Sequence, residues 1–341
     1  MDVVEVPVQD KLTNEWFCQR PKEETLLPDL EIVDCHHHLW MRANSHYYVD
    51  HLIRDISSGH RVTATVYVEA GDYYRKDGPE DLKPVGETEH LLELANKHRR
   101  ELGGGLSAIV GHADLTTGEA VGPVLDAHVE AGEGRFRGVR VRAQWDPSGY
   151  VLGGSAPPGL LSDPIFRTGF DVLARRGLSC DLLHFFHQAP EVADLADAFP
   201  DCPIIVNHFG WPIGGGPYEG RLSEVFAEWR LLLPELARRP NIYMKMGGLA
   251  SPWSGISFSR EESPPSSEVL ARTWAPYFHR TIETFGPARC MMQSNFPVDR
   301  TACTYHTLWN AFKRIGMEYS SSERAQMFAG VAREVYRLAT P

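Results

Sequence analysis

The sequence has no long apolar segment. No stretch offers the roughly 18 uninterrupted apolar residues that a membrane-spanning helix needs. The first residues, MDVVEVPVQDKLTNEWF, lack the apolar centre of a signal peptide, so we expect a cytoplasmic protein. Lysine and arginine form no cluster, and the formal net charge is −11, which argues against nucleic acid as a partner.

Cysteine pairs and nucleotide-binding glycines are also missing. The six cysteines, at positions 18, 35, 180, 202, 290 and 303, form no C-x-x-C pair, so we expect reduced thiols. No G-x-G-x-x-G follows the first predicted strand, which disfavours an open nucleotide-binding sheet. The composition, 43% hydrophobic and 23% charged, is that of an ordinary globular protein.

Short apolar runs alternate with helical patterns along the chain. Several runs are rich in β-branched residues and apolar at every position, as parallel strands buried on both faces should be. The expected strands are 31–36, 61–69, 106–112, 137–142, 178–184, 203–208, 241–246 and 289–294. This alternation predicts an α/β fold, a single-domain (β/α)8 TIM barrel over residues 31–341 behind an N-terminal arm at 1–30. The alternative is an open, doubly wound sheet.

The long irregular segments follow strands rather than precede them. In a barrel they all rise from the carboxyl-terminal rim, where catalytic groups gather. They carry the aromatic residues Tyr73, Tyr74, Trp145, Tyr150, Trp211, Tyr218 and Trp253. Two interpretations stay open: these residues wall a pocket for a small, partly apolar substrate, or they seal the loops together.

Three consecutive histidines end the first expected strand, in EIVDCHHHLW. Side chains alternate along a strand, so His36 and His38 share a face and are placed to converge on one divalent ion. His208 ends the sixth strand in PIIVNHFGWP, as a third ligand, a group that polarises a carbonyl, or a core histidine. His184 and His187 are three residues apart, so at most one of them faces the same pocket.

Charged residues at other strand ends complete the candidate site. Glu69 is the best candidate for an inward acid and our first choice for proton transfer. Arg140, with Arg142 on the same face, is suited to clamp a substrate carboxylate, and Lys245 to stabilise an oxyanion. The alternative for each is an ion pair within the barrel.

Three motifs together resemble the amidohydrolase superfamily. HHHLW at 36–40, NHFGWP at 207–212 and SNFPVD at 294–299 are similar to its amidohydrolase-2 branch, which includes sugar and muconate-type lactonases. The resemblance covers roughly residues 31–338. It implies a TIM barrel with a rim active site that hydrolyses a small lactone or a related ester or amide. It also implies a divalent metal, zinc first, at His36, His38 and His208, although some lactonases of this branch work without one.

The eighth strand departs from that pattern. Many relatives carry an Asp there as proton shuttle, but this sequence has Asn295, with Gln293 two places earlier. An amide takes no proton from water near neutral pH. Either Glu69, Asp299 or a histidine supplies the base, or the protein is a lyase or isomerase such as a decarboxylase or dehydratase. A third possibility is a barrel that binds a small molecule without turnover.

We therefore predict a hydrolase that opens a small lactone or related ester, with or without a metal. The partner is a small-molecule substrate, with no membrane involved, and a homo-oligomer is possible. The candidate catalytic residues are Glu69, His208, Lys245, Asn295 and Asp299, and the candidate substrate-binding residues are Trp40, Tyr73, Arg140, His187, Gln188, Trp211 and Gln293.

Overall fold

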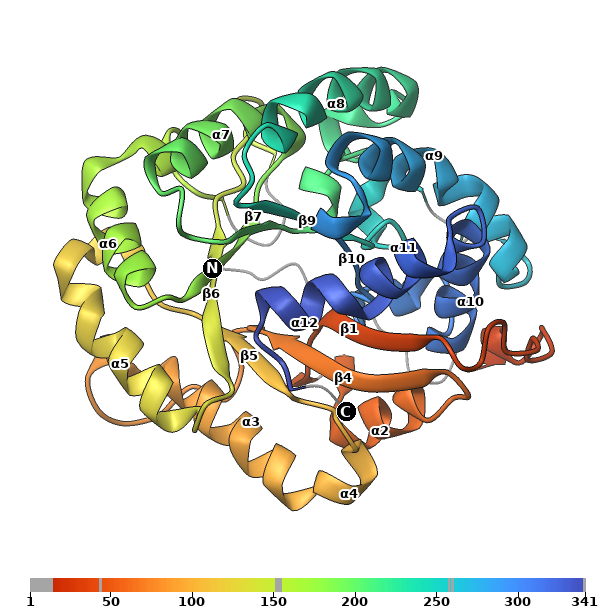
Figure 1. The fold of residues 1–341 in the computed structure, drawn as a ribbon, viewed down its shortest axis with the longest axis horizontal. Coiled ribbons are helices and arrows are strands. Elements are labelled where there is room, and N and C mark those ends of the chain that lie inside the picture. Colours follow the sequence, from red (N-terminus) through yellow and green to blue (C-terminus); the bar gives the residue numbers. More distant parts are fainter. Residues whose placement is uncertain (1–14, 43–44, 151–154, 257, 259–260, 340–341) are drawn as a thin grey trace.

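Eight parallel strands form the centre of the molecule, and helices surround them (Figure 1). The computed structural model describes residues 15–42, 45–150, 155–256, 258 and 261–339. The strands pair in chain order: β1 (Glu31–His37), β4 (Arg61–Val68), β5 (Ala108–Gly111), β6 (Phe136–Arg142), β7 (Ser179–Leu183), β8 (Ile204–Val206), β9 (Ile242–Met246) and β10 (Cys290–Met292). The predicted (β/α)8 barrel is confirmed.

Each strand is followed by a helix that packs on the outside of the barrel. These helices are α2 (Val49–Ile56), α3 (Val85–Lys97), α5 (Gly122–Ala131), α6 (Pro164–Arg175), α7 (Ala189–Ala198), α8 (Leu222–Ala237), α9 (Ser267–Phe285) and α10 (Tyr305–Gly316). Side-chain caps fix where several begin: Asp163 accepts from two backbone amides of α6, and Ser266 and Thr304 cap α9 and α10. Their apolar faces and the outer faces of the strands form the main core.

The barrel closes between β1 and β10 through a few contacts rather than a full ladder. The backbone N–H of His38 donates to the Phe296 carbonyl at 2.7 Å, and that of Asn295 donates to the His36 carbonyl at 2.9 Å. The buried Asp34 carboxylate accepts the Ser294 amide at 2.8 Å. This closure fixes the histidines of β1 against the chain that follows β10.

Two of the strands end two residues earlier than predicted. β8 ends at Val206 rather than at 208, and β10 ends at Met292 rather than at 294. His208 and Asn295 then take left-handed backbone angles, with φ of 52° and 55°, which non-glycine residues rarely adopt. Gln293 and Asn295 therefore lie beyond the strand and do not share a strand face, because the alternation of side chains stops where the strand stops.

The C-terminal segment covers the amino-terminal end of the barrel. It comprises α11 (Ser321–Ala325) and α12 (Val331–Val335), and α12 lies across the strands in Figure 1. Arg333 on α12 pairs with Glu31 at the start of β1, and the Tyr336 carbonyl accepts from Arg137 in β6 at 2.7 Å. This end of the barrel is plugged, so access to the interior is from the opposite rim.

The segment before β1 packs against α10. The Lys313 ammonium donates to the carbonyls of Leu26 and Leu27 at 2.8 and 2.9 Å, and the Leu26 amide donates to Asn310 at 3.0 Å. The first half of the predicted arm lies outside the described residues. The domain boundary at residue 30 stays a prediction.

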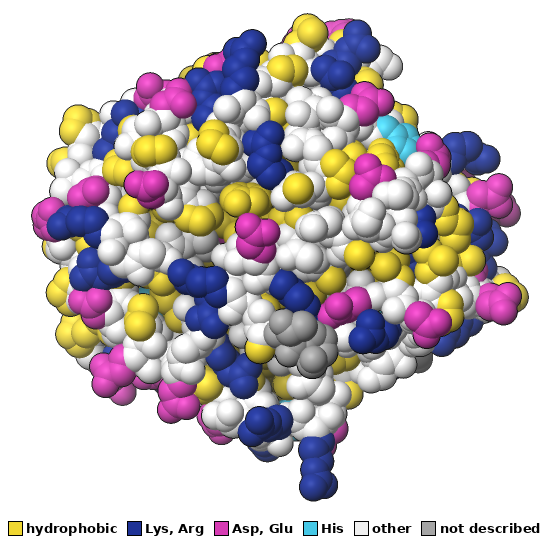
Figure 2. Space-filling model, in the orientation of Figure 1, with side chains coloured by type: hydrophobic (Ala, Val, Ile, Leu, Met, Phe, Trp, Pro, Cys, Tyr) yellow, Lys and Arg dark blue, Asp and Glu magenta, His cyan; other side chains and the backbone are white. Residues whose placement is uncertain are grey.

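The cysteines and the helices agree with two expectations from the sequence, reduced thiols and no membrane-spanning helix. All six cysteines are free thiols, and no described helix is long and apolar enough to cross a bilayer. On the face drawn in Figure 2, basic and acidic side chains are interspersed.

We predict that Asp34→Ala weakens the closure of the barrel. The change leaves the Ser294 amide and the Tyr305 hydroxyl, which donates to Asp34 at 3.0 Å, without acceptors. At about 1–3 kcal/mol for each buried unpaired donor, the free energy of unfolding in urea should fall by about 2–5 kcal/mol. Tyr305→Phe, which removes one of the two donors, should cost clearly less, and equal losses would contradict this account.

Candidate active site

His36 and His38 face each other at the carboxyl end of β1, as the strand alternation predicted. Their Nε2 atoms are 3.1 Å apart, and both side chains are buried. Burial is the largest cause that lowers the pKa of each imidazole well below its ordinary value. Both rings are therefore neutral near pH 7. His37 points the other way and bonds to Thr65.

A chain of hydrogen bonds assigns the protons on these two rings. The Lys245 ammonium can only donate, so His36 Nδ1, at 3.4 Å, accepts, and the His36 proton sits on Nε2. That proton points at His38 Nε2. His38 in turn carries its proton on Nδ1 and donates it to the Val68 carbonyl at 2.8 Å. Every nitrogen in the pair has a role that its neighbours dictate.

Lys245 and Asp181 form a fully buried ion pair beneath the imidazoles. The ammonium and carboxylate are 2.5 Å apart, and both side chains are completely inaccessible. Asp181 also accepts from the Tyr336 hydroxyl, at 3.0 and 2.9 Å, and from the Asn207 amide at 3.2 Å. These bonds satisfy the carboxylate, which is the condition for a buried pair to be tolerated.

His208 lies beside the pair, on the turn after β8. Its ring centroid is 4.8 Å from that of His36, and burial lowers its pKa to about 3. The Gln293 amide contacts His208 Nδ1 at 2.5 Å, while the other amide atom, Oε1, is buried without a partner. Trp211, whose ring lies 5.8 Å from His208, also has an unpartnered indole N–H. A ligand here would find polar groups ready to bond.

Two arginines hold Glu69. Arg140 and Arg142 bond to its carboxylate at 2.7 and 2.8 Å, and these cations hold its pKa below the ordinary value against the opposing effect of burial. Glu69 is an ionised group of low basicity. Its surroundings do not favour the proton transfer that we expected of it, and they occupy the fork of Arg140 that was expected to clamp a substrate carboxylate.

Asp299 lies beside Asn295, which is four positions earlier in the sequence. The Asn295 amide donates to the Asp299 carboxyl at 2.7 Å, and the Ala250 amide contacts it at 3.4 Å. Burial raises the pKa of Asp299 to about 8, against the opposing effect of its hydrogen bonds from Asn295, Ala250 and Gly248. The cis peptide Phe296–Pro297 and the turn at Val298–Thr301 bring this acid back to the end of β10.

A cavity of about 980 Å³ opens beside these groups. Trp40, Glu69 and Arg140 belong to its lining, and Trp40 stacks on His38 with ring centroids 5.9 Å apart. Its lining also includes Arg42, Asp72, Tyr74, His112, Asp114, Arg142 and Phe166. Three loops, after β4, β5 and β6, build most of the wall.

The other predicted substrate-binding residues have varied surroundings. Tyr73 stacks on His90 of α3 at 4.1 Å, and its neighbour Tyr74 lines the cavity instead. Gln188 bonds to the backbone at Trp145, Phe185 and Ala143, which makes it a support for the rim. His187 Nε2 donates to the Asp146 carboxylate at 3.0 Å.

Sequence reasoning missed two acids that shape the rim. Glu87, in the first turn of α3, accepts from the Tyr67 hydroxyl and from the amides of Ala70, Gly71 and Asp72 at 2.8 to 3.3 Å. Asp146 joins three loops through Ser148, His187 and Tyr218. In the sequence, Glu87 could have been recognised as an acid on an otherwise apolar helix face, in GETEHLLEL. For Asp146 the sequence offers only its position after a strand.

The barrel imidazoles do not make a complete metal site. A ligand must offer a lone pair, but His36 carries its Nε2 proton because its Nδ1 faces an ammonium rather than an acceptor. Within the described residues, His208 does not join His36 and His38 in a group of three close ligand atoms, and the nearest partners from β10 are amides. The donor set therefore does not fit a divalent ion in this arrangement.

Comparison with known proteins assigns the family. A family model described as amidohydrolase matches residues 33–338. The chain belongs to the amidohydrolase family. It is therefore an enzyme, and the predicted family is confirmed.

Three relatives illustrate the range of similarity. The "uncharacterized protein y4mH" of Sinorhizobium fredii is 32% identical over 335 residues, 92% of this chain and 100% of that protein. An L-fucono-1,5-lactonase of Burkholderia ambifaria is 24% identical over 331 residues, 91% of this chain and 96% of the lactonase. The crystal structure of an amidohydrolase from Burkholderia multivorans with bound HEPES has a TM-score of 0.70 at 25% identity, covering 90% of this chain and 99% of that one. A second crystal form of the latter holds zinc.

We predict that Glu87 fixes the loop that walls the cavity. In Glu87→Ala, the amides of residues 70–72 lose their acceptor, so they should exchange with solvent at least tenfold faster, and the free energy of unfolding should fall by about 2–4 kcal/mol. Glu87→Gln keeps an acceptor oxygen and should show a much smaller change. Unaltered exchange at these amides in the alanine variant would contradict the proposed support.

Proposed function

We propose that this amidohydrolase opens a neutral, polyhydroxylated lactone by hydrolysis. The observation that carries the proposal is a buried chain of hydrogen bonds. The Lys245 ammonium donates to His36 Nδ1, and the opposite Nε2–H of His36 then points to the place where a carbonyl oxygen would bind. The relatedness to an L-fucono-1,5-lactonase over nearly the whole chain supports the choice of a lactone.

The charges around the cavity support a neutral substrate. Its lining holds the cations Arg42, Arg140 and Arg142 and the anions Glu69, Asp72 and Asp114, three of each sign. Arg42 pairs with Asp72, and both other arginines pair with Glu69. An anionic substrate would have to displace these partners, whereas hydroxyl groups can bond to the carboxylates beside the rings of Trp40 and Tyr74.

In the proposed reaction, the lactone carbonyl oxygen replaces His38 as the acceptor of the His36 Nε2 proton. Negative charge then develops on that oxygen as water attacks the carbonyl carbon. The Lys245 ammonium behind His36 stabilises this charge without leaving its ion pair, because the buried surroundings do not screen it as water would. His208, which lies beside His36, and the indole N–H of Trp211, which lies beside His208, complete the binding of the substrate.

We assign the proton transfer to Asp299. Glu69 is held as an anion by two arginines, and Asp181 is paired with Lys245 beneath the imidazoles. Glu87 and Asp146 bond to the loops that they support. Asp299 has only amide donors and a pKa of about 8, near the working range of a general base. As a carboxylate it takes a proton from the attacking water, and it returns the proton to the ring oxygen when the carbon–oxygen bond breaks.

Glu69 then has a different role from the one that the sequence suggested. Its carboxylate holds Arg140 and Arg142 at the cavity edge, so it orients these groups and does not transfer protons. The lyase alternative rests on the amides Gln293 and Asn295 at the end of β10, which leave the barrel with few acids to activate water.

The first test is a comparison of substrates. Chelator-treated protein should open L-fucono- or related sugar lactones and release one proton per turnover, because the hydroxy acid product ionises at neutral pH. A chelator should not abolish this activity, since the barrel donor set does not fit a metal. Carbon dioxide release from hydroxybenzoates without lactone opening would favour the lyase instead.

The second test concerns Asp299. Because the base must be deprotonated, kcat/KM should rise with pH through about 8. Asp299→Asn should lower kcat by about 100-fold or more and remove this rise. Asp55→Asn is the matched control: burial raises the pKa of this carboxyl too, to about 6, but its bond is to Tyr47. A normal pH profile in Asp299→Asn would overturn the assignment.

A further inference from the structure

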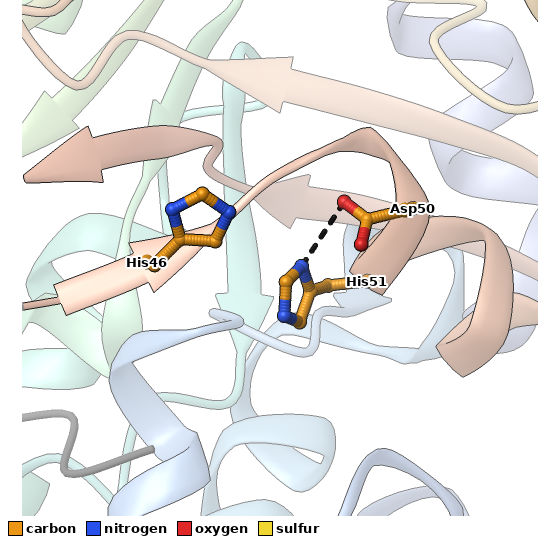
Figure 3. Close-up of side chains that lie close together, drawn as sticks. All are labelled: His46, Asp50 and His51. Carbon is orange, nitrogen blue, oxygen red and sulfur yellow. Dashed lines mark hydrogen bonds and ion pairs between the residues drawn. The ribbon is translucent and has the colours of Figure 1, made fainter.

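The small hairpin that follows β1 carries a second group of metal-ligating side chains. It consists of β2 (Trp40–Arg42) and β3 (Ser45–Tyr47), and α2 begins directly after it. His46, Asp50 and His51 each offer a ligand atom, and these atoms all lie within 4.8 Å of one another. Figure 3 shows the His46 ring on the strand turned toward His51 and Asp50 on the first turn of the helix.

We propose that His46, Asp50 and His51 bind a zinc ion, with water in the fourth position. Two imidazoles and one carboxylate are ligands that zinc favours. The three atoms would have to approach to about 3.4 Å, which follows from zinc bonds of about 2.0–2.1 Å at tetrahedral angles. Side-chain rotation suffices for this, because His46 and His51 are half-buried and Asp50 is exposed.

The environment of each ligand supports the site. Among the described residues, the His46 imidazole has a ring contact with His51, at 5.2 Å between centroids, and no hydrogen bond. Asp50 lies 3.2 Å from His51 Nδ1 and supplies the anion that a dication needs. Two positive charges near the site oppose the binding of a cation: Arg54 and the amino end of α2.

The hairpin places this site back to back with the cavity. In the β2–β3 register Met41 pairs with His46, while Trp40 pairs with Tyr47 and Arg42 with Ser45. Successive side chains point to opposite faces, so His46 lies on the face away from Trp40, Arg42 and Ser45, which line the cavity. A bound zinc would tie the hairpin to α2 and so hold this wall in place.

The site does not depend on the proposed hydrolysis, and its test uses zinc binding alone. Untagged full-length protein, stripped with a chelator, is titrated with zinc in equilibrium dialysis, and cobalt absorption is recorded as a second readout. We expect His46→Gln and Asp50→Asn to weaken zinc binding at least tenfold and to remove the tetrahedral cobalt bands. His36→Gln should keep both, and His46→Gln should open lactones at the wild-type rate.

The result separates the two histidine groups. Zinc that stays bound in His46→Gln and Asp50→Asn but leaves in His36→Gln would overturn the proposal, as would wild-type protein that binds no zinc. If His36→Gln does not fold, His46→Gln and Asp50→Asn still decide, because His46 is half-buried and Asp50 exposed, so the melting temperatures of these variants without metal should match the wild type.

Discussion

The buried ion pair between Lys245 and Asp181 determines how the rest of the site is arranged. An ammonium inside a barrel needs a close counter-charge, and the counter-charge needs its remaining lone pairs filled, which Tyr336 and Asn207 do. The free donor of the lysine then sets which nitrogen of His36 carries the proton, and His36 sets that of His38. One charge pair thus defines the polarity of the catalytic face.

The Lys245–Asp181 pair also links the catalytic rim to the C-terminal segment at the opposite end of the barrel. Tyr336 belongs to the C-terminal segment that plugs the amino-terminal end, yet its hydroxyl reaches Asp181 below the imidazoles. The plug is therefore part of the support of the site. A C-terminal segment that contributed packing alone could have used phenylalanine here, and it would then leave both Asp181 oxygens with fewer donors in a place where water cannot replace them.

The sequence was informative wherever local patterns control the structure. Apolar runs and turn signals predicted the eight strands, and alternation along β1 correctly paired His36 with His38 and separated His37. Prediction failed beyond the ends of β8 and β10, where positive φ angles at His208 and Asn295 redirect the chain. Ion pairs within the barrel, the alternative for Glu69, Arg140 and Lys245, are confirmed. The partners were not predictable, because nothing near Glu69 in the sequence indicates two arginines and nothing near Lys245 indicates Asp181 or Tyr336.

The presence of Lys245 explains why positions 293 and 295 carry amides rather than acids. A divalent metal ion would bring two positive charges, and acids at the end of β10 could balance them. Here the positive charge behind His36 is a single ammonium that Asp181 already neutralises. A further carboxylate against these imidazoles would be a buried anion without a partner, at a cost of several kcal/mol. Amides avoid that cost, and the acid is instead found further along the chain, at Asp299, where burial raises its pKa to about 8.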